Sequence, residues 1–265
     1  MLMISPAKIN IFLYLHQYYN KRFQLQTLFC KIPGLHDEIL IEESDKLEVI
    51  SQPYHIENNI VEKVLKELKI SNVRITINKK IPIDAGLGGG SSNAATVLQA
   101  LSNDYFKNLA IARKLGYDIE FFLYETDSVL FNDAEDKREI VNLGFFLPLL
   151  LIIPDFPLST AQVFYEAKYD IKLNRLDTSF LRLDVMRDIY SGHNELYKYA
   201  FRVDKRIETV ISAINQCDGI IFSRMSGSGS SCFGVFQSIE DAQAACEEIK
   251  KSYPSWLYHV VTLRI

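Results

Sequence analysis

The sequence has 265 residues, of which 48% are hydrophobic and 23% charged, a balance typical of a globular protein of one large or two modest domains. The formal net charge of −4 provides no basic field for nucleic acid or an anionic membrane, so neither partner is expected. None of the four cysteines forms a Cys-x-x-Cys pair, and the N-terminus does not have the profile of a signal peptide. These features predict a soluble cytoplasmic protein with reduced thiols.

The first half of the chain alternates between strand and helix patterns. Apolar side chains recur on one side of residues 58–68, which predicts a helix. Residues 38–43 and 46–51 are predicted to form a pair of strands joined by a turn at Ser44 and Asp45. Further strands are predicted over 9–15, 25–32 and 73–77, and an alanine-rich helix over 92–101.

The second half starts near Leu147 and mixes the two patterns again. Strands are predicted over 145–153, 219–223, 232–236 and 256–263, and helices from about Thr160 and over 180–188, 195–201, 204–215 and 239–250. This mixture favours an α+β fold, with helices packed on one side of the sheets, over a regular βαβ array. We expect two domains, residues 1–147 and 148–265.

The strongest chemical signal is the glycine-rich stretch from Gly86 to Asn93, Gly-Leu-Gly-Gly-Gly-Ser-Ser-Asn, which leads into the alanine-rich helix. Glycines let the backbone approach a ligand closely, and the amides at the start of a helix attract anions. The stretch therefore predicts a phosphate site. It is not a Walker A loop, because no Gly-Lys-Ser/Thr follows, and it lacks the third glycine of a dinucleotide fingerprint. The alternative is a turn with a helix cap at Ser91 or Ser92.

Lys8 and Asn10 stand two residues apart on a predicted strand, so their side chains project to the same face. A cation and an amide on one face suit a phosphate or a hydroxyl-bearing substrate, although a solvated strand face would show the same pattern. Asp118 lies among apolar residues and is either a helix cap or a functional carboxylate. The glycine–serine segment 225–231 joins two apolar strands, which also fits a plain hairpin loop.

Together these stretches resemble the GHMP kinase superfamily, whose three motifs occur here in the same order: the strand with Lys8 and Asn10, the central glycine loop and the C-terminal glycine–serine loop. The resemblance implies a two-domain α+β fold, with an N-terminal ribosomal-protein-S5-like ATP domain and a C-terminal ferredoxin-like α/β domain. It also implies a small-molecule kinase that uses ATP and Mg²⁺.

Within this superfamily, the segments 5–13 and 25–29 are similar to those of the kinases that phosphorylate cytidine diphosphate methylerythritol in the non-mevalonate isoprenoid pathway. The resemblance implies that Lys8 and Asp118 flank the acceptor hydroxyl, and that Asn59 borders the adenine. The ATP phosphates would lie against Gly86, Leu87, Gly88, Gly89, Gly90, Ser91, Ser92 and Asn93, with Ser92 near the metal. The acceptor would bind at Asn10, Phe23, Thr160, Phe164, Gly227 and Ser228.

The sequence departs from these kinases in the segment with which they recognise cytosine. The histidine and the tyrosine of the family's segment appear here as Phe23 and Arg22. Two alternatives stay open: another GHMP kinase acting on mevalonate, homoserine or a sugar, and a nucleotide-binding relative without catalysis. A monomer or a weak homodimer is expected.

Overall fold

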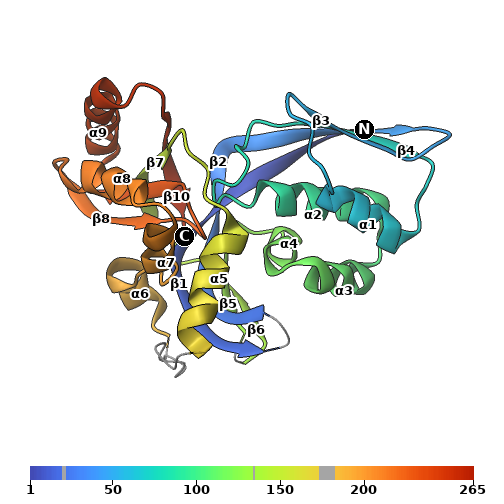
Figure 1. Cartoon of the computed structure of the whole chain (residues 1–265), viewed down its shortest axis with the longest axis horizontal. Helices are drawn as coiled ribbons and strands as arrows, with labels where there is room; N and C mark the ends of the chain where they lie inside the picture. The colour runs from blue at the N-terminus through green and yellow to red at the C-terminus, as the bar shows by residue number, and fades with distance from the viewer. Residues whose placement is uncertain (20–21, 134, 173–182) are drawn as a thin grey trace. The chain divides into compact units, whose positions relative to one another are not determined.

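A computed structural model describes residues 1–19, 22–133, 135–172 and 183–265 (Figure 1). The chain divides into two compact units. The first unit comprises Met1–Lys8, Ile32–Ile83 and Gly88–Thr126, and the second comprises Ile9–Lys31, Asp84–Leu87 and Asp127–Ile265. The long strands β1 (Leu2–Tyr19) and β2 (Arg22–Glu43) contribute to both units. A single boundary between residues 147 and 148 divides the chain differently and stays a prediction.

The sheet of the first unit is centred on β4 (Val73–Asn78). Residues 38–43 of β2 pair with β4 in the antiparallel sense, and β3 (Glu48–Gln52) pairs with its other side in the parallel sense. The predicted pairing of 38–43 with 46–51 is therefore wrong, because β4 lies between them. A helix connects β3 to β4, and such a crossover brings two strands together as parallel neighbours.

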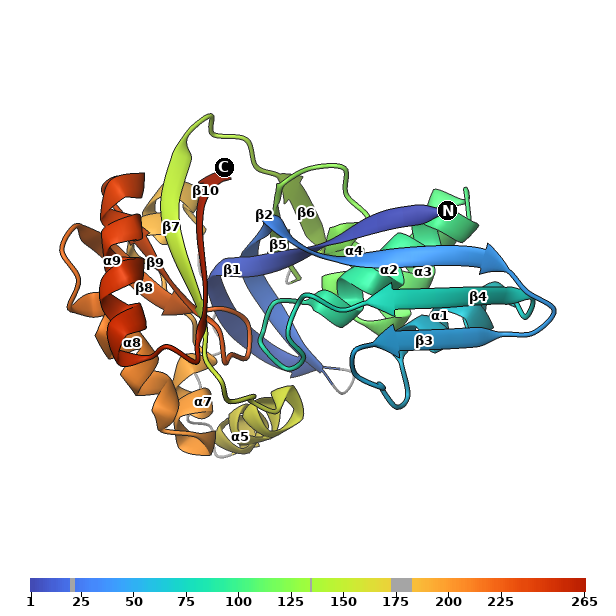
Figure 2. The same cartoon turned by 90° about the horizontal axis from the view of Figure 1, so that it is seen from above.

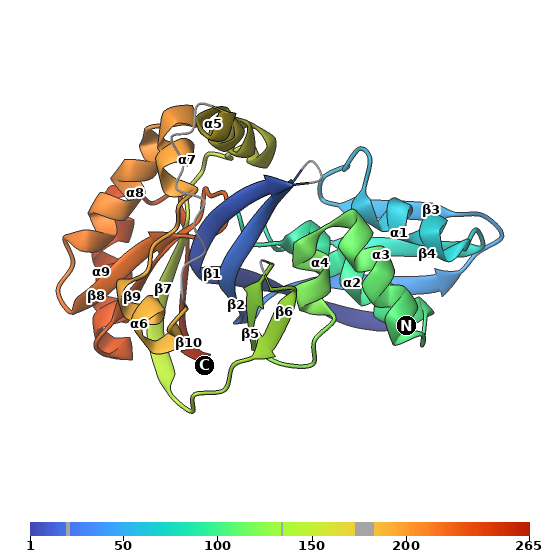
Figure 3. The same ribbon diagram turned by 90° about the horizontal axis from the view of Figure 1, so that it is seen from below.

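Four helices belong to the first unit: α1 (Ile60–Leu68), α2 (Gly89–Leu101), α3 (Tyr105–Leu115) and α4 (Tyr117–Phe122). Helices α1 and α2 lie along the sheet, and α3 and α4 lie beyond them on the same side (Figures 1 and 3). The predicted helices at 58–68 and 92–101 are confirmed, the second beginning three residues earlier. Helices α3 and α4 were not predicted, although Asp104 caps α3 by accepting from the Lys107 amide at 3.0 Å.

The second unit contains a four-stranded antiparallel sheet in the order β10-β7-β9-β8. Its strands are β7 (Phe146–Ile153), β8 (Ile220–Met225), β9 (Cys232–Phe236) and β10 (Leu257–Arg264). All four were predicted within one or two residues. A smaller pairing joins residues 26–30 of β2 to β5 (Ser128–Asn132), which also pairs with β6 (Lys137–Ile140).

Helices α8 (Arg206–Asn215) and α9 (Ile239–Ser252) pack on one face of the four-stranded sheet (Figure 2). Buried side chains from both layers, such as Leu150, Val210 and Ile214, form the core between them. The other helices among the described residues are α5 (Thr160–Lys172), α6 (Val185–Ser191) and α7 (Tyr197–Val203). Residues 180–182 of the helix predicted at 180–188 lie outside the described residues. The predicted α+β class is confirmed. None of the helices in the described part of the chain has the length and apolar character needed to cross a membrane.

Candidate active site

The glycine-rich stretch forms the entry to α2. Gly88 is the N-cap residue, with a φ of 68°, and the helix runs from Gly89. The helix cap predicted as an alternative at Ser91 or Ser92 is therefore wrong, because both serines lie in the first turn. The Ser92 amide is the first to find an acceptor in the turn, donating to the Gly88 carbonyl at 2.8 Å. The amides before it belong to the donors that a helix start leaves without intrahelical acceptors, which suits an anion.

Gly88 has two reasons to be glycine. Its positive φ is strained for a residue with a side chain. A Cβ at this position would also lie 3.0 Å from both Cγ and Cε of Lys8 and 3.2 Å from the Phe122 ring. The aliphatic stem of Lys8 therefore lies directly against the turn that starts α2.

Lys8 pairs with Asp118, with 3.4 Å between Nζ and Oδ2. Lys8 is only 2% exposed, so the solvated strand face considered from the sequence is wrong. The side chain of Asp118 is 33% exposed and lies in the first turn of α4. Gly116, not Asp118, is the N-cap of that helix, so the helix-cap interpretation of Asp118 is wrong as well. A cation and a partly open carboxylate thus lie beside the phosphate-type turn within one compact unit.

A second ion pair of the first unit, between Lys79 and Asp37, was missed by the sequence analysis. The two side chains are 4% and 0% exposed, and the Asp37 carboxylate also accepts from the amides of Lys80 and Ile81 at 2.8 Å each. A Cβ at Gly89 would lie 3.0 Å from Lys79 Nζ, so this ammonium group contacts the first residue of α2.

The same network continues into α2 through Asn93. The Asn93 Nδ2 donates to Asp37 at 2.9 Å and to the Ser5 hydroxyl at 2.9 Å, and Ser5 in turn donates to the Ser92 hydroxyl at 2.8 Å. Ser92 is fully buried. The polar side chains after the glycines therefore anchor the helix start inside the first unit. Ser91, which is half-buried, is the less enclosed of the two serines.

Asn59 precedes α1 and caps it. Its Oδ1 accepts from the Val61 amide at 3.0 Å, and its Nδ2 donates to the Ser51 hydroxyl at 3.1 Å. The side chain thus has a structural task of its own. The predicted position of Asn59 beside adenine stays a prediction.

In the second unit, Asn10 is buried on β1. Its Nδ2 donates to the Thr27 hydroxyl at 2.8 Å, and its backbone amide donates to the Ser226 hydroxyl at 3.4 Å. The Ser226 hydroxyl also donates to the Gly86 carbonyl at 3.0 Å. Asn10 is 1% exposed, and Leu87 after Gly86 is buried as well.

Gly86 packs tightly against the loop between β8 and β9. A Cβ on Gly86 would lie 2.2 Å from the Ser226 carbonyl oxygen, and the Ser231 amide donates to the Ala85 carbonyl at 3.1 Å. The loop closes a hairpin, because β8 and β9 pair and the Ser226 amide donates to the Ser231 carbonyl at 2.9 Å. The hairpin interpretation is confirmed, and the loop also holds the segment that begins the glycine-rich stretch.

The remaining predicted acceptor residues gather around α5. The hydroxyls of Thr160 and Ser228 are hydrogen bonded at 2.8 Å, and Asn194 donates to the carbonyl of Gly227 at 2.8 Å. Phe164 lies one turn after Thr160, and its ring centroid is 5.7 Å from that of Phe23.

Phe23 also contacts Tyr18, with ring centroids 5.2 Å apart, and Phe23 is only 4% exposed. Phe164 is half-buried, so the ring that is more open to a stacking ligand is Phe164.

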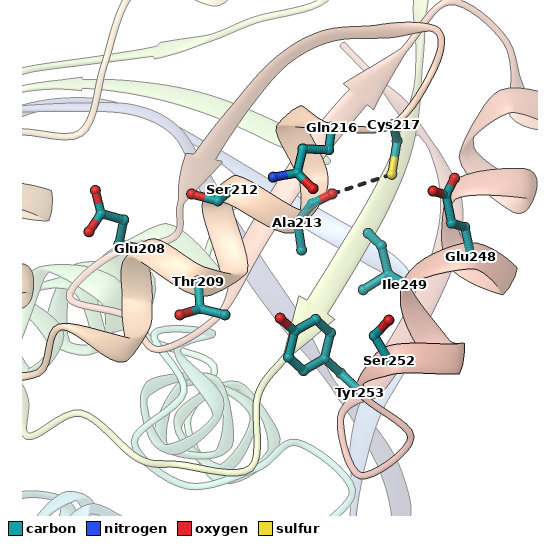
Figure 4. A pocket seen from close by; sticks show the side chains of 10 residues that line it. All are labelled: Glu208, Thr209, Ser212, Ala213, Gln216, Cys217, Glu248, Ile249, Ser252 and Tyr253. Atoms are coloured by element: carbon teal, nitrogen blue, oxygen red, sulfur yellow. Dashed lines mark hydrogen bonds between the residues drawn. The ribbon is translucent and has the colours of Figure 1, made fainter.

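A pocket of about 410 Å³ lies between α8 and α9, away from these residues (Figure 4). Cys217, at its wall, hydrogen bonds to the Ala213 carbonyl at 3.4 Å, and burial raises the pKa of its thiol to about 11. A thiol with a raised pKa is a poor nucleophile. None of the predicted site residues lines this pocket.

The comparisons with known proteins identify the family of the chain. The model of the GHMP kinase N-terminal domain matches residues 55–122, and that of the GHMP kinase C-terminal domain matches residues 181–255. These matches define the chain as a member of the GHMP kinases, a class of phosphotransferases.

The relatives narrow the class further. A 4-diphosphocytidyl-2-C-methyl-D-erythritol kinase of Thermodesulfovibrio yellowstonii is 32% identical over 80% of this chain and 81% of its own. One from Wolbachia sp. subsp. Brugia malayi is 29% identical over 95% and 94% of the two chains. The crystal structure of a 4-(cytidine 5'-diphospho)-2C-methyl-D-erythritol kinase superposes with a TM-score of 0.76 and 26% identity over the whole of both chains. The chain belongs to the family of 4-diphosphocytidyl-2-C-methyl-D-erythritol kinases.

Proposed function

We propose that this protein transfers the γ-phosphoryl group of ATP to the 2-hydroxyl of 4-diphosphocytidyl-2-C-methyl-D-erythritol, a step of the non-mevalonate route to isoprenoid precursors. The observation that carries the proposal is the 3.4 Å pair of Lys8 and Asp118 beside the Gly88 turn at the start of α2. The identity of the acceptor rests on the relatives and on the residues around Phe164.

The glycine-rich stretch is assigned to the nucleotide phosphates. Gly88, Gly89 and Gly90 present backbone without side chains, and the helix start adds amide donors and a partial positive charge. In phosphoryl transfer, most of the catalysis comes from positioning and from neutralising charge. The role proposed for these amides is to hold the β- and γ-phosphates in line with the acceptor oxygen.

Asp118 is assigned to the acceptor hydroxyl. The new bond forms between the hydroxyl oxygen and the γ-phosphorus, the bond from that phosphorus to the β,γ-bridging oxygen breaks, and ADP leaves. The hydroxyl proton passes to the Asp118 carboxylate. Lys8 offsets charge that develops on the transferred group.

Mg²⁺ would supply charge neutralisation at the phosphates when it is bound with the nucleotide. The described residues contain no cluster of three or more His, Cys, Asp or Glu side chains that could hold a metal ion. The role of Ser92 as a ligand of the metal ion stays a prediction. The Ser92 hydroxyl already accepts a hydrogen bond from Ser5.

The second unit is assigned to the acceptor. Phe164 offers a half-buried ring for stacking on cytosine, with Phe23 packed against it. Asn10, Thr160, Gly227 and Ser228 are assigned to the polar parts of the same molecule. The predicted monomer or weak homodimer, the cytoplasmic location and the absence of nucleic acid and membrane partners stay predictions.

The experiment that tests the proposal compares acceptors with purified protein, ATP and Mg²⁺, and follows ADP formation. We expect turnover with 4-diphosphocytidyl-2-C-methyl-D-erythritol, and at least a hundredfold lower kcat/KM with methylerythritol phosphate, which lacks the cytidine part. Turnover on mevalonate, homoserine or a sugar instead would assign the protein to another GHMP kinase. Nucleotide binding without turnover on any acceptor would show a non-catalytic relative.

A further inference from the structure

Helix α4, which carries Asp118, also carries a carboxylate that the proposed mechanism does not use. The Glu120 side chain is 0% exposed, although three other residues of this six-residue helix, Ile119, Phe121 and Phe122, are already buried. Arg113 of α3 grips it with two hydrogen bonds, from Nε to Oε2 at 3.1 Å and from Nη2 to Oε1 at 3.0 Å. This is the two-pronged geometry in which an arginine fixes the orientation of a carboxylate as well as its position.

Such a pair is not an economical way to stabilise a helix junction. Taking a carboxylate out of water is unfavourable, and apolar side chains of similar volume at such positions often give equal or greater stability. Arg113 is 39% exposed, so the pair keeps one half in contact with solvent. An ion pair that adds little net stability but fixes the orientation of a helix is best explained by the side chains that this helix carries.

The ion pair lies at the junction between α3 and α4. Gly116 is the only residue between the two helices, and it serves as the C-cap of α3 and the N-cap of α4. The ion pair spans this junction, from Arg113 on α3 to Glu120 on α4. Ile119 and Phe121 are fully buried, and Phe122 reaches Gly88, so α4 also borders the turn at the start of α2.

We propose that Arg113 and Glu120 act as a positioning pair for the reaction: they hold α4 in the rotation that points the Asp118 carboxylate at Lys8. Asp118 and Glu120 are two residues apart on the same helix, so a rotation of α4 moves both carboxylates together. A displacement of about 1 Å at a reacting group can cost on the order of a hundredfold in rate. The inference rests on the proposed function, because it assigns to Asp118 the task of meeting the acceptor hydroxyl.

The first experiment is a double-mutant cycle with Glu120→Gln and Asp118→Asn, followed by kcat and KM in steady state and by single turnover for the slow variants. We expect Glu120→Gln to lower kcat about tenfold while KM for ATP changes less than twofold. In the Asp118→Asn background the same substitution should change the residual rate less than twofold. A purely structural ion pair would reduce the rate by the same factor in both backgrounds, which would overturn the proposal.

The matched control is a second carboxylate–arginine pair between two helices. Arg202 of α7 donates to Asp170 of α5 at 3.0 Å, and the two side chains are 43% and 6% exposed, close to the values for Arg113 and Glu120. We expect Asp170→Asn to lower the thermal midpoint about as much as Glu120→Gln, with less than a twofold change in kcat. An equal loss of kcat in both variants would show that the effect of Glu120 is general destabilisation.

The second experiment separates stability from activity. The double variant Arg113→Met with Glu120→Met replaces the ion pair by apolar side chains of similar length. We expect an unchanged or higher thermal midpoint and a kcat at least tenfold lower. A double variant with wild-type kcat would overturn the proposal, because the junction would then need no fixed direction.

The proposed role of Asp118 and the positioning role of Glu120 can be overturned independently of each other. If Asp118→Asn keeps most of the wild-type rate, the proposed function of Asp118 is wrong, and the positioning role of Glu120 is wrong with it, because there is then no catalytic carboxylate to position. If Asp118→Asn loses the rate but Glu120→Gln does not, or if the two losses multiply, the function of Asp118 stands and the positioning role of Glu120 is wrong.

Discussion

Two lysine–carboxylate pairs lie near the start of α2, and they differ in almost every physical respect. The pair of Lys79 and Asp37 is closed: both side chains are buried, and Asp37 accepts further hydrogen bonds from two backbone amides and from Asn93. The pair of Lys8 and Asp118 is looser, with 3.4 Å between the charged atoms and a third of the Asp118 side chain exposed. A closed carboxylate has its lone pairs occupied, whereas an open one can still meet a substrate.

The difference indicates that the two pairs have different tasks: the closed pair stabilises the fold, and the open pair takes part in catalysis. A carboxylate surrounded by donors that remain in place is suited to anchor backbone, and Asp37 anchors the segment before the glycine-rich stretch. A carboxylate with one cation and open surface is suited to accept a proton. Substitutions of the two aspartates should therefore affect different quantities.

The largest effect is expected at the open pair. Asp118→Asn should lower kcat by 10²–10⁴, the usual contribution of a general base, because an amide does not accept the hydroxyl proton. The thermal midpoint should fall less than in Asp37→Asn, because a third of the Asp118 side chain is exposed even though Lys8 is buried, and the affinity for ATP should stay close to the wild-type value. Steady-state kinetics, calorimetry and nucleotide titration measure the three quantities. Retention of more than about a tenth of the wild-type turnover would remove Asp118 from the role of base.

The closed pair should respond in stability. Asp37→Asn leaves the Lys79 ammonium buried beside a neutral group, and breaking a buried pair in this way costs about 3–5 kcal/mol. We expect a clearly lower denaturant midpoint, while the kcat of the protein that remains folded falls less than about tenfold. Chemical denaturation together with active-site titration separates the two.

Glu38, the neighbour of Asp37, offers the control. It pairs with Lys80 on the surface, where both side chains are partly exposed. Glu38→Gln should leave the denaturant midpoint nearly unchanged, because exposed ion pairs contribute little. If Asp37→Asn were as mild as Glu38→Gln, the closed pair would not be the anchor described above.

The sequence was sufficient to find the open pair but not the closed one. Lys8 and Asp118 were assigned to one site by the resemblance to the GHMP kinases, whereas their local patterns alone left a solvated strand face and a helix cap open. Lys79 and Asp37 lie in a run of mixed charges, Asn-Lys-Lys and His-Asp-Glu, where burial of one charge cannot be distinguished from exposure of its neighbour. Only the fold shows that Asp37 is inside and Glu38 outside.

The fold shows the same limit. Local patterns predicted α1, α2 and the four strands of the second sheet, because periodicity and turn residues are local signals. The pairing of residues 38–43 was predicted wrongly, because strand partners depend on a connection through α1 that no local pattern reports. Helices α3 and α4 were missed, and with them the junction that carries Asp118. Gly116 between them is a breaker signal that could have indicated two short helices.

The smallest effect concerns the contact that links the open pair to the nucleotide turn. Gly88→Ala places a Cβ 3.0 Å from two carbons of the Lys8 side chain, at a φ of 68°. The strained backbone should cost about 1–2 kcal/mol of stability. Because the Lys8 stem can yield, its ammonium group should move relative to Asp118, and kcat should fall about tenfold.

Gly90→Ala is the comparison for stability, since its Cβ would meet only Ile60, at 3.8 Å, within a helix. That variant should be as stable as the wild type or more so, because alanine favours helix over glycine by up to about 1 kcal/mol. Equal thermal midpoints for the two alanine variants, with kcat unchanged in Gly88→Ala, would mean that Lys8 does not depend on the turn for its position, and the distinction between the two pairs would lose its structural basis.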